Sequence, residues 1–208
     1  MSNMKLWDSV CVTDPAAVKP ITGKQYKGNS PKPYWVIRRA TETFGPCGIG
    51  WGVQVVSERF ERLTDTDVLH VAMVRVWYIQ DGKRGEIEQM GQTKASYKTA
   101  AGGTMVDEDA PKKSVTDGMV KCLSMIGFAG DIFSGQWDDS KYVAWAEEQY
   151  QPKPDVSAIL KGIATSTTLQ LLKTNFSHAL QMLDKDHHEA IISAKDKRKS
   201  ELEAKEKA

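Results

Sequence analysis

Basic side chains gather in the middle of the chain, just before and along one predicted helix. They are Lys94, Lys98, Lys112, Lys113 and Lys121. Arg38 and Arg39 lie earlier, and the aromatic candidates are Trp35, Trp51 and Tyr97. Binding of single-stranded DNA without sequence preference requires cations spaced along the phosphates and flat side chains on which bases stack. We therefore take these residues as candidates for DNA binding.

The same residues also have a structural interpretation. Lys113, Asp117 and Lys121 are spaced four residues apart, so they could form ion pairs on a solvated helix face. Trp51 begins an apolar run and could be a core anchor. The sequence leaves both interpretations open.

Carboxylates and histidines raise the alternative of a metal-dependent nuclease. The carboxylates are Glu86, Glu88, Asp107, Glu108, Asp138 and Asp139, and the histidine pair is His187-His188. Adjacent residues on a helix point about 100° apart, so the histidine pair does not converge, and we expect His70 to be buried in a strand. The chain has no P-loop, C-x-x-C or Ser/His/Asp constellation. We therefore expect a protein without catalytic residues, metal or cofactor.

Composition is that of a protein that folds in water. The chain has 208 residues, 40% of them hydrophobic and 26% charged, with a formal net charge of +1. A basic site must therefore come from local sorting of charge. The 3 cysteines form no C-x-x-C pair, and no apolar run approaches the ~18 residues of a membrane span. The N-terminus lacks the layout of a signal peptide, so we expect a cytoplasmic protein.

The helix that carries the central lysines is predicted over residues 111–127. Its apolar stripe is Val115, Met119, Cys122, Leu123 and Ile126, and its polar side is Lys113, Asp117, Lys121 and Ser124. This spacing is typical of an amphipathic helix with one face in the core. Pro111 suits the first turn and Gly127 suits the end.

The segments before this helix alternate between helix and strand signals. We predict an arm with a short helical turn near residues 15–18, a helix over 33–44, and strands over 51–60, 68–79 and 85–91. Asp81-Gly82 is a strong hairpin signal, so the strands should form a three-stranded antiparallel meander. Residues 92–109 are predicted to be a long loop, which is usually functional or disordered.

The C-terminal part is predicted to be separate and helical. Residues 131–142 should be rich in turns and 142–150 a short helix, after which residues 151–154 form a linker with Pro152 and Pro154. Helical spacing returns over 169–183 and 186–206. We therefore expect an α+β fold, with a DNA-binding and oligomerisation domain over 1–150 and a helical module over 151–208.

The assembled order of elements resembles a known family. The motifs are Phe44-Gly45, Gly50-Trp51, Ala72-Met73-Val74-Arg75-Val76, Asp81-Gly82, and Ser114 to Leu123 followed by Gly127. Over residues 33–143 they resemble the annealing domain of the Rad-fifty-two superfamily, with phage single-strand annealing proteins as the closer relatives. The Val-Thr-Asp-Gly segment of the last motif is the most specific part.

The resemblance implies a homo-oligomeric ring or filament that anneals single strands in DNA recombination and repair, without ATP or cofactor. Lys121 matches a basic position in the family's helix, and Lys94, Lys98, Lys112 and Lys113 stand in the matching loop and helix start. Val120, Ser124 and Trp35 depart from basic positions of the family, with Arg38 and Arg39 as substitutes for the last. By the same resemblance, the C-terminal helices would bind single-strand-binding protein or a companion exonuclease.

A double-stranded RNA-binding domain is the alternative with the same order of elements. Lys112 and Lys113 at a helix start would then clamp phosphates. Such domains run to ~70 residues and have no long loop of this kind. The acidic run Asp107-Glu108-Asp109 would repel RNA, which favours the annealing interpretation.

Overall fold

The computed structural model describes residues 3–22, 27–151 and 154–206. The chain divides into two compact units, Met1–Tyr150 and Gln151–Ala208. Pro152 and Lys153 of the predicted linker lie outside the described residues. Across the described ranges, no helix is both long and apolar enough to span a membrane. The fold of the chain is α+β.

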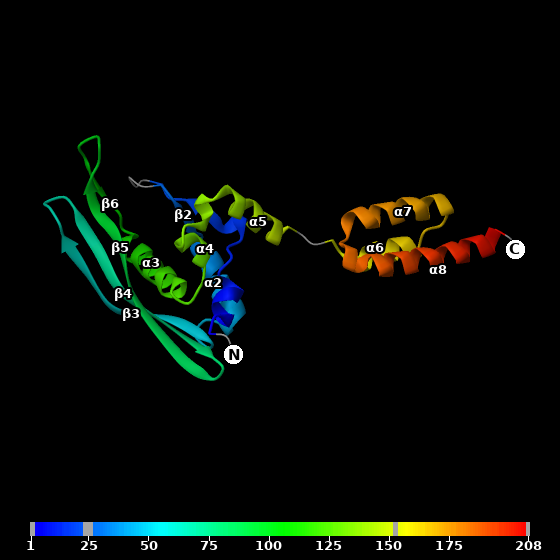
Figure 1. Ribbon diagram of the computed structural model, residues 1–208. Coiled ribbons are helices and arrows are strands. Elements are labelled where there is room, and N and C mark those ends of the chain that lie inside the picture. The colour runs from blue at the N-terminus through cyan, green and yellow to red at the C-terminus, as the bar shows by residue number, and fades with distance from the viewer. Residues whose placement is uncertain (1–2, 23–26, 152–153, 207–208) are drawn as a thin grey trace. The chain divides into compact units, whose positions relative to one another are not determined.

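A curled antiparallel sheet forms one layer of the N-terminal unit (Figure 1). Its strands, in order, are β3 (Trp51–Arg62), β4 (Val68–Gln80), β5 (Lys83–Lys98) and β6 (Thr104–Val106). Asp81 and Gly82 have positive φ of 50° and 72°, as a two-residue hairpin turn requires. The predicted meander of β3, β4 and β5 is confirmed, and β6 adds a fourth strand that we did not expect.

The prediction of a loop over residues 92–109 is wrong. β5 continues to Lys98 because His70 and Leu69 on β4 pair with Thr93 and Lys94. Gly102, at φ 85°, helps to turn the chain into β6, and the backbone N–H of Asp107 then bonds the carbonyl of Ala95 at 2.8 Å. The segment is polar because much of it faces solvent, which concealed its strand character.

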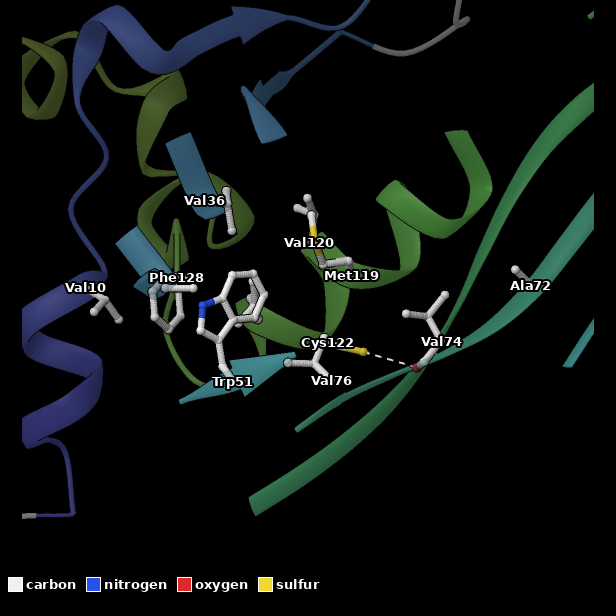
Figure 2. Packing of buried hydrophobic residues seen from close by; sticks show 12 residues of the cluster. Val10, Val36, Trp51, Ala72, Val74, Val76, Met119, Val120, Cys122 and Phe128 are labelled. Atoms are coloured by element: carbon white, nitrogen blue, oxygen red, sulfur yellow. Dashed lines mark hydrogen bonds between the residues drawn. The ribbon is translucent and has the colours of Figure 1, made fainter. Parts of the chain in front are cut away.

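Helix α3 (Ala110–Ser124) packs on β4 and β5 and closes the core, as its periodicity predicts. Met119, Cys122 and Leu123 are buried, and the Cys122 thiol donates to the carbonyl of Val74 at 3.3 Å (Figure 2). Ser114 and Gly118 are also buried against the sheet. Lys113 and Lys121 remain on the solvent side.

Helix α2 (Pro33–Phe44) lies beside α3 and supplies Val36 and Ala40 to the same core. The predicted arm is more ordered than expected. It forms α1 (Lys5–Val10), the short helix η1 (Pro15–Ala17), and a two-stranded sheet of β1 (Val18–Pro20) and β2 (Asn29–Pro31). Residues 23–26 of the arm lie outside the described residues.

Asp131 fastens the arm to the segment that follows α3. That segment forms α4 (Gly130–Phe133), η2 (Gln136–Asp138) and α5 (Ser140–Tyr150). The buried Asp131 carboxylate accepts hydrogen bonds from the Thr13 N–H at 2.8 Å, the Trp137 indole at 2.8 Å and the Tyr142 hydroxyl at 2.9 Å. The carboxylate therefore joins four parts of the chain, and its burial is compensated by these donors.

The C-terminal unit is a bundle of helices with its own core. Its elements are α6 (Val156–Ala164), α7 (Leu169–Met182), η3 (Lys185–His187) and α8 (His188–Glu206). Ile163, Leu172 and Ile191 are among the residues buried between the helices. The sequence did not predict α6, whose N-cap Asp155 accepts a hydrogen bond from the Ala158 N–H.

Candidate nucleic-acid interface

The sheet of the N-terminal unit has two different faces. One face carries Ala72, Val74 and Val76 and is covered by α3. Figure 1 shows the helices of this unit on that side. The other, which we call the free face, carries Leu69, Met73, Arg75 and Trp77 of β4 and their β5 partners Lys94, Met90, Glu88 and Glu86. Any ligand that binds along the strands meets the free face.

Lys94, Tyr97 and Lys113 come together at one corner of the sheet, which we call the β5 corner. The register shift at Ala95 brings Lys94 and Tyr97 to the same side of β5, and the Lys94 Nζ stands 5.6 Å from the Tyr97 ring centroid. Lys113 Nζ lies 2.6 Å from the Asp107 carboxylate, and this hydrogen bond raises the pKa of Lys113. The Tyr97 phenol is close enough to contribute to the same shift.

Lys98 and Lys112 flank this corner. Lys98 is the last residue of β5. Its backbone N–H donates to the Asp67 carboxylate at 3.3 Å, and its side chain is exposed. Lys112 lies in the first turn of α3. Its side chain is 84% exposed and pairs with Asp109 at 2.9 Å, and this hydrogen bond lowers the pKa of Asp109. Lys94 and Lys98, which were predicted to lie in a loop, therefore lie on β5, and Lys112 lies at the start of α3 as predicted.

Lys121 lies further along α3, beside the outer edge of β5. Its Nζ is 2.9 Å from the Asp117 carboxylate, which also accepts the backbone N–H of Gln92 at 3.3 Å. The i,i+4 ion pair of the structural interpretation is therefore present. An exposed pair of this kind contributes little to stability, so Lys121 stays available to an anion.

Arg38, Arg39 and Trp35 belong to α2, and no hydrogen bond or ion pair among the described residues joins them to the β5 corner. Both arginines bond Glu42, and these hydrogen bonds lower the pKa of Glu42. Arg39 also donates to the carbonyl of Ser9 at 2.8 Å, which ties α2 to the arm. Trp35 is partly buried against the core. Arg39 and Trp35 therefore have structural roles, and Arg38 is the exposed cation of the group.

The prediction that Trp51 stacks on bases is wrong. Its side chain is 1% exposed, and its indole N–H donates to the Thr41 hydroxyl at 3.3 Å. The ring fills the core between α2 and the sheet (Figure 2). A buried indole has no face to offer a base, so Trp51 is the core anchor that the structural interpretation allowed.

The carboxylates considered for a metal-dependent nuclease do not gather into one group in the described residues. Among the described residues, no group of His, Cys, Asp and Glu converges as metal ligands would. Glu86 and Glu88 pair with arginines, and Asp107 and Asp109 pair with lysines. His70 is buried in β4 as expected, with its Nε2 3.5 Å from the Glu58 carboxylate.

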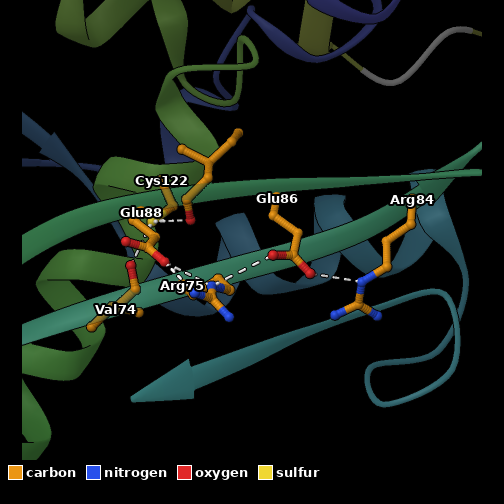
Figure 3. A network of polar contacts seen from close by, with 7 residues as sticks. Val74, Arg75, Arg84, Glu86, Glu88 and Cys122 are labelled. Atoms are coloured by element: carbon orange, nitrogen blue, oxygen red, sulfur yellow. Dashed lines mark hydrogen bonds and ion pairs between the residues drawn. The ribbon is translucent and has the colours of Figure 1, made fainter. Parts of the chain in front are cut away.

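A group of charged side chains on the free face was not predicted from the sequence (Figure 3). Arg75 Nε donates to Glu88 at 2.8 Å, and Arg84 Nε donates to Glu86 at 2.8 Å. Glu86 also lies 3.6 Å from Arg75, and the hydrogen bond from Arg84 lowers the pKa of Glu86. Arg84 stands over the ring of Trp77 at 4.5 Å. Strand alternation could have placed these residues on one face, but their pairing depends on the register.

Comparison with known proteins adds no identification. A scan of protein-family models and a search of curated proteins each returned no match for the chain.

Proposed function

We propose that the protein binds single-stranded DNA through the β5 corner and anneals complementary strands without ATP or metal. The observation that carries the proposal is the gathering of Lys94, Tyr97 and Lys113 at one end of the sheet. Lys113 pairs with Asp107, whose backbone N–H bonds the carbonyl of Ala95, the neighbour of Lys94. Lys98, Lys112 and Lys121 extend this group along β5 and α3. Cations beside an aromatic ring are the combination that single strands require, and the resemblance to annealing domains supports the same function.

The ion pairs of these lysines are compatible with DNA binding. Lys112 and Lys113 face Asp109 and Asp107 on the surface, where water and salt screen the attraction. A DNA phosphate can therefore replace the carboxylate. Because each phosphate contact releases a counterion, binding should weaken steeply with salt.

We infer self-assembly from the edges of the sheet. The outer edge of β3 pairs with no described strand beyond the bridge between Cys47 and Trp51, and β6 covers the outer edge of β5 only at its end. Open edges of this length tend to pair with other chains. Contacts between copies at these edges would build the ring or filament that the resemblance implies.

A mixing assay tests the function directly. Two labelled complementary oligonucleotides are combined with the full chain, without nucleotide or divalent metal, and duplex formation is followed by energy transfer. We expect faster annealing than in buffer, and oligomers in electron micrographs with or without DNA. Annealing at the uncatalysed rate, or tighter binding to double-stranded RNA than to single-stranded DNA, contradicts the proposal.

A further inference from the structure

Trp77 lies over a glycine on the free face of the sheet. Gly52 of β3 is the cross-strand partner of Trp77. A Cβ added to Gly52 would meet the indole Nε1 at 2.7 Å and two ring carbons at 2.8 Å. The indole therefore occupies the space that a side chain at position 52 would need, and it rests directly on the backbone of β3.

Arg84 stands over this ring with part of its hydrogen-bonding capacity unused. Its Cζ is 4.5 Å from the ring centroid of Trp77, and its side chain is 51% exposed. Only its Nε bonds Glu86, and its terminal nitrogens have no ion-pair partner in the part of the chain that the structure describes (Figure 3). The guanidinium group of Arg84 covers the ring face that does not rest on β3. When it moves off the ring to bind a phosphate with its free N–H donors, that face becomes available for a base to stack on.

The β5 corner opens onto the same face. Lys94 pairs with Leu69 on the free face, and Tyr97 lies beside Lys94. Trp77 on β4 pairs with Glu86 on β5. The rings of Trp77 and Tyr97 therefore mark the two ends of the stretch of β5 that runs from residue 86 to residue 97. At ~3.3 Å per residue this stretch spans about 36 Å. That length corresponds to about ten nucleotides at the ~3.4 Å helical rise, and to fewer in an extended strand.

We propose that single-stranded DNA runs along β5 over the free face, with one base on Trp77 and another on Tyr97, and with phosphates at Arg84 and Lys94. This inference rests on the proposed function and defines the path of the strand. It adds Trp77 and Arg84, which the sequence analysis did not select, to the binding residues.

The carboxylates of the free face limit the affinity of this path. The Arg75 Nε donates a hydrogen bond to the Glu88 carboxylate at 2.8 Å. Glu86 forms ion pairs with both Arg75 and Arg84. A phosphate must compete with these carboxylates for the arginines. Glu88→Gln should therefore free Arg75 from its ion pair and strengthen DNA binding. If the network of arginines and glutamates served only the folding of the sheet, the same substitution would not strengthen binding.

Fluorescence anisotropy with a labelled thirty-nucleotide oligo-dT tests the path in the full chain. We expect Trp77→Ala to weaken binding by about fivefold or more, and Trp77→Phe by less than about twofold, because a ring remains for stacking. Glu88→Gln should bind about twofold tighter. The control is Phe60→Ala, an exposed aromatic paired with His70 on the opposite face of the sheet, which should change affinity by less than about twofold.

Photocross-linking of the wild-type chain gives an answer that does not depend on the folding of a variant. Oligo-dT that carries 5-iododeoxyuridine should cross-link to the tryptic peptide of residues 76–83, which contains Trp77. No cross-link to this peptide, or unchanged affinity in both Trp77→Ala and Glu88→Gln, overturns the inference. A Trp77→Ala protein that loses its oligomeric state in sedimentation but keeps its DNA affinity also overturns it, and assigns the face to contacts between copies.

The two proposals fail in different ways. If the wild-type chain does not bind oligo-dT, the proposed function is wrong, and this inference falls with it. If Lys94→Ala and Lys113→Ala weaken binding while Trp77→Ala and Glu88→Gln leave the affinity unchanged, the β5 corner binds DNA and only the path over the free face is wrong.

Discussion

Gly91 of β5 and Gly118 of α3 lie in direct backbone contact. A Cβ on Gly91 would be 1.9 Å from the carbonyl oxygen of Ser114 and 2.4 Å from the nitrogen of Gly118. A Cβ on Gly118 would meet Val74 at 2.7 Å. The helix therefore rests on the sheet without an intervening side chain at this point, which explains the glycine of the Val-Thr-Asp-Gly segment. The contact also sets Lys113 and Lys121 beside the edge of β5.

Gly118→Ala should destabilise the N-terminal unit. The added methyl group forces α3 away from β4 and β5, which should lower the free energy of unfolding by about 1–3 kcal/mol. Urea unfolding followed by circular dichroism measures the loss.

The matched control is Gly162→Ala in α6, where an added Cβ meets nothing within 4 Å. A helix-interior glycine replaced by alanine should gain about 0.5–1 kcal/mol. Equal stability of Gly118→Ala and wild type would show that the close approach is not required.

Lys94→Ala and Lys113→Ala should weaken binding of single-stranded DNA and reduce its salt dependence. Each variant loses one phosphate contact, so the slope of log K against log salt should fall in magnitude by about 0.7. Titrations of labelled oligo-dT at several salt concentrations measure this change. Lys141→Ala, an exposed lysine of α5, is the control and should leave the slope unchanged. Slopes that do not differ between the variants and wild type would place the phosphates elsewhere.

The stability of the N-terminal unit should fall at alkaline pH through Tyr142. Burial, and then the hydrogen bond to Asp131, raise the pKa of the Tyr142 phenol above its ordinary value of 10.0. The protonated phenol therefore stabilises the folded state below pH about 10, and this stabilisation is lost as pH rises above that value. Thermal unfolding of wild type and Tyr142→Phe from pH 8 to 11 checks the prediction. The variant should start lower and decline less, and parallel curves would contradict it.

A chain that ends at Tyr150 should still fold, oligomerise and anneal bare oligonucleotides. The core of the N-terminal unit comes from residues 10–128, and the hydrogen bond from the Tyr150 hydroxyl to the Val12 carbonyl stays within the fragment. Cooperative unfolding, sedimentation and the annealing assay measure the three properties. We propose that the removed helices recruit a partner protein.

Lys121→Ala in the full chain is the complementary variant. It should weaken DNA binding and leave assembly unchanged, because the side chain lies opposite the buried Met119 and Leu123. If truncation abolishes DNA binding while Lys121→Ala leaves it intact, the DNA site lies in the C-terminal unit and the assignment to the β5 corner is wrong.

The sequence alone predicted the helix at residues 33–44, a helix over residues 111–127 that the structure has at 110–124, and the turn at Asp81-Gly82. These features depend on local physics, namely helical periodicity of apolar residues and the positive φ that a tight hairpin needs. The same signals predicted the α+β class and burial of Met119, Cys122 and Leu123, which the structure confirms. Local clustering of basic residues selected the lysines of the β5 corner, because their positions along the chain are visible in the sequence.

The tertiary structure decided which aromatic rings are buried and which basic side chains lie beside an aromatic ring. Trp51 and Trp77 both lie in predicted strands, yet Trp51 is buried between α2 and the sheet and Trp77 lies on the free face. Lys94 reaches Tyr97 because the register shift at Ala95 changes the side to which the following residues point. These outcomes depend on pairing between residues far apart in the chain, where a shift of one residue reverses the faces of a strand. The local turn signal at Asp81-Gly82 sets the start of the β4–β5 pairing but predicts neither the shift at Ala95 nor the burial by α2, so only the packed sheet determines those two features.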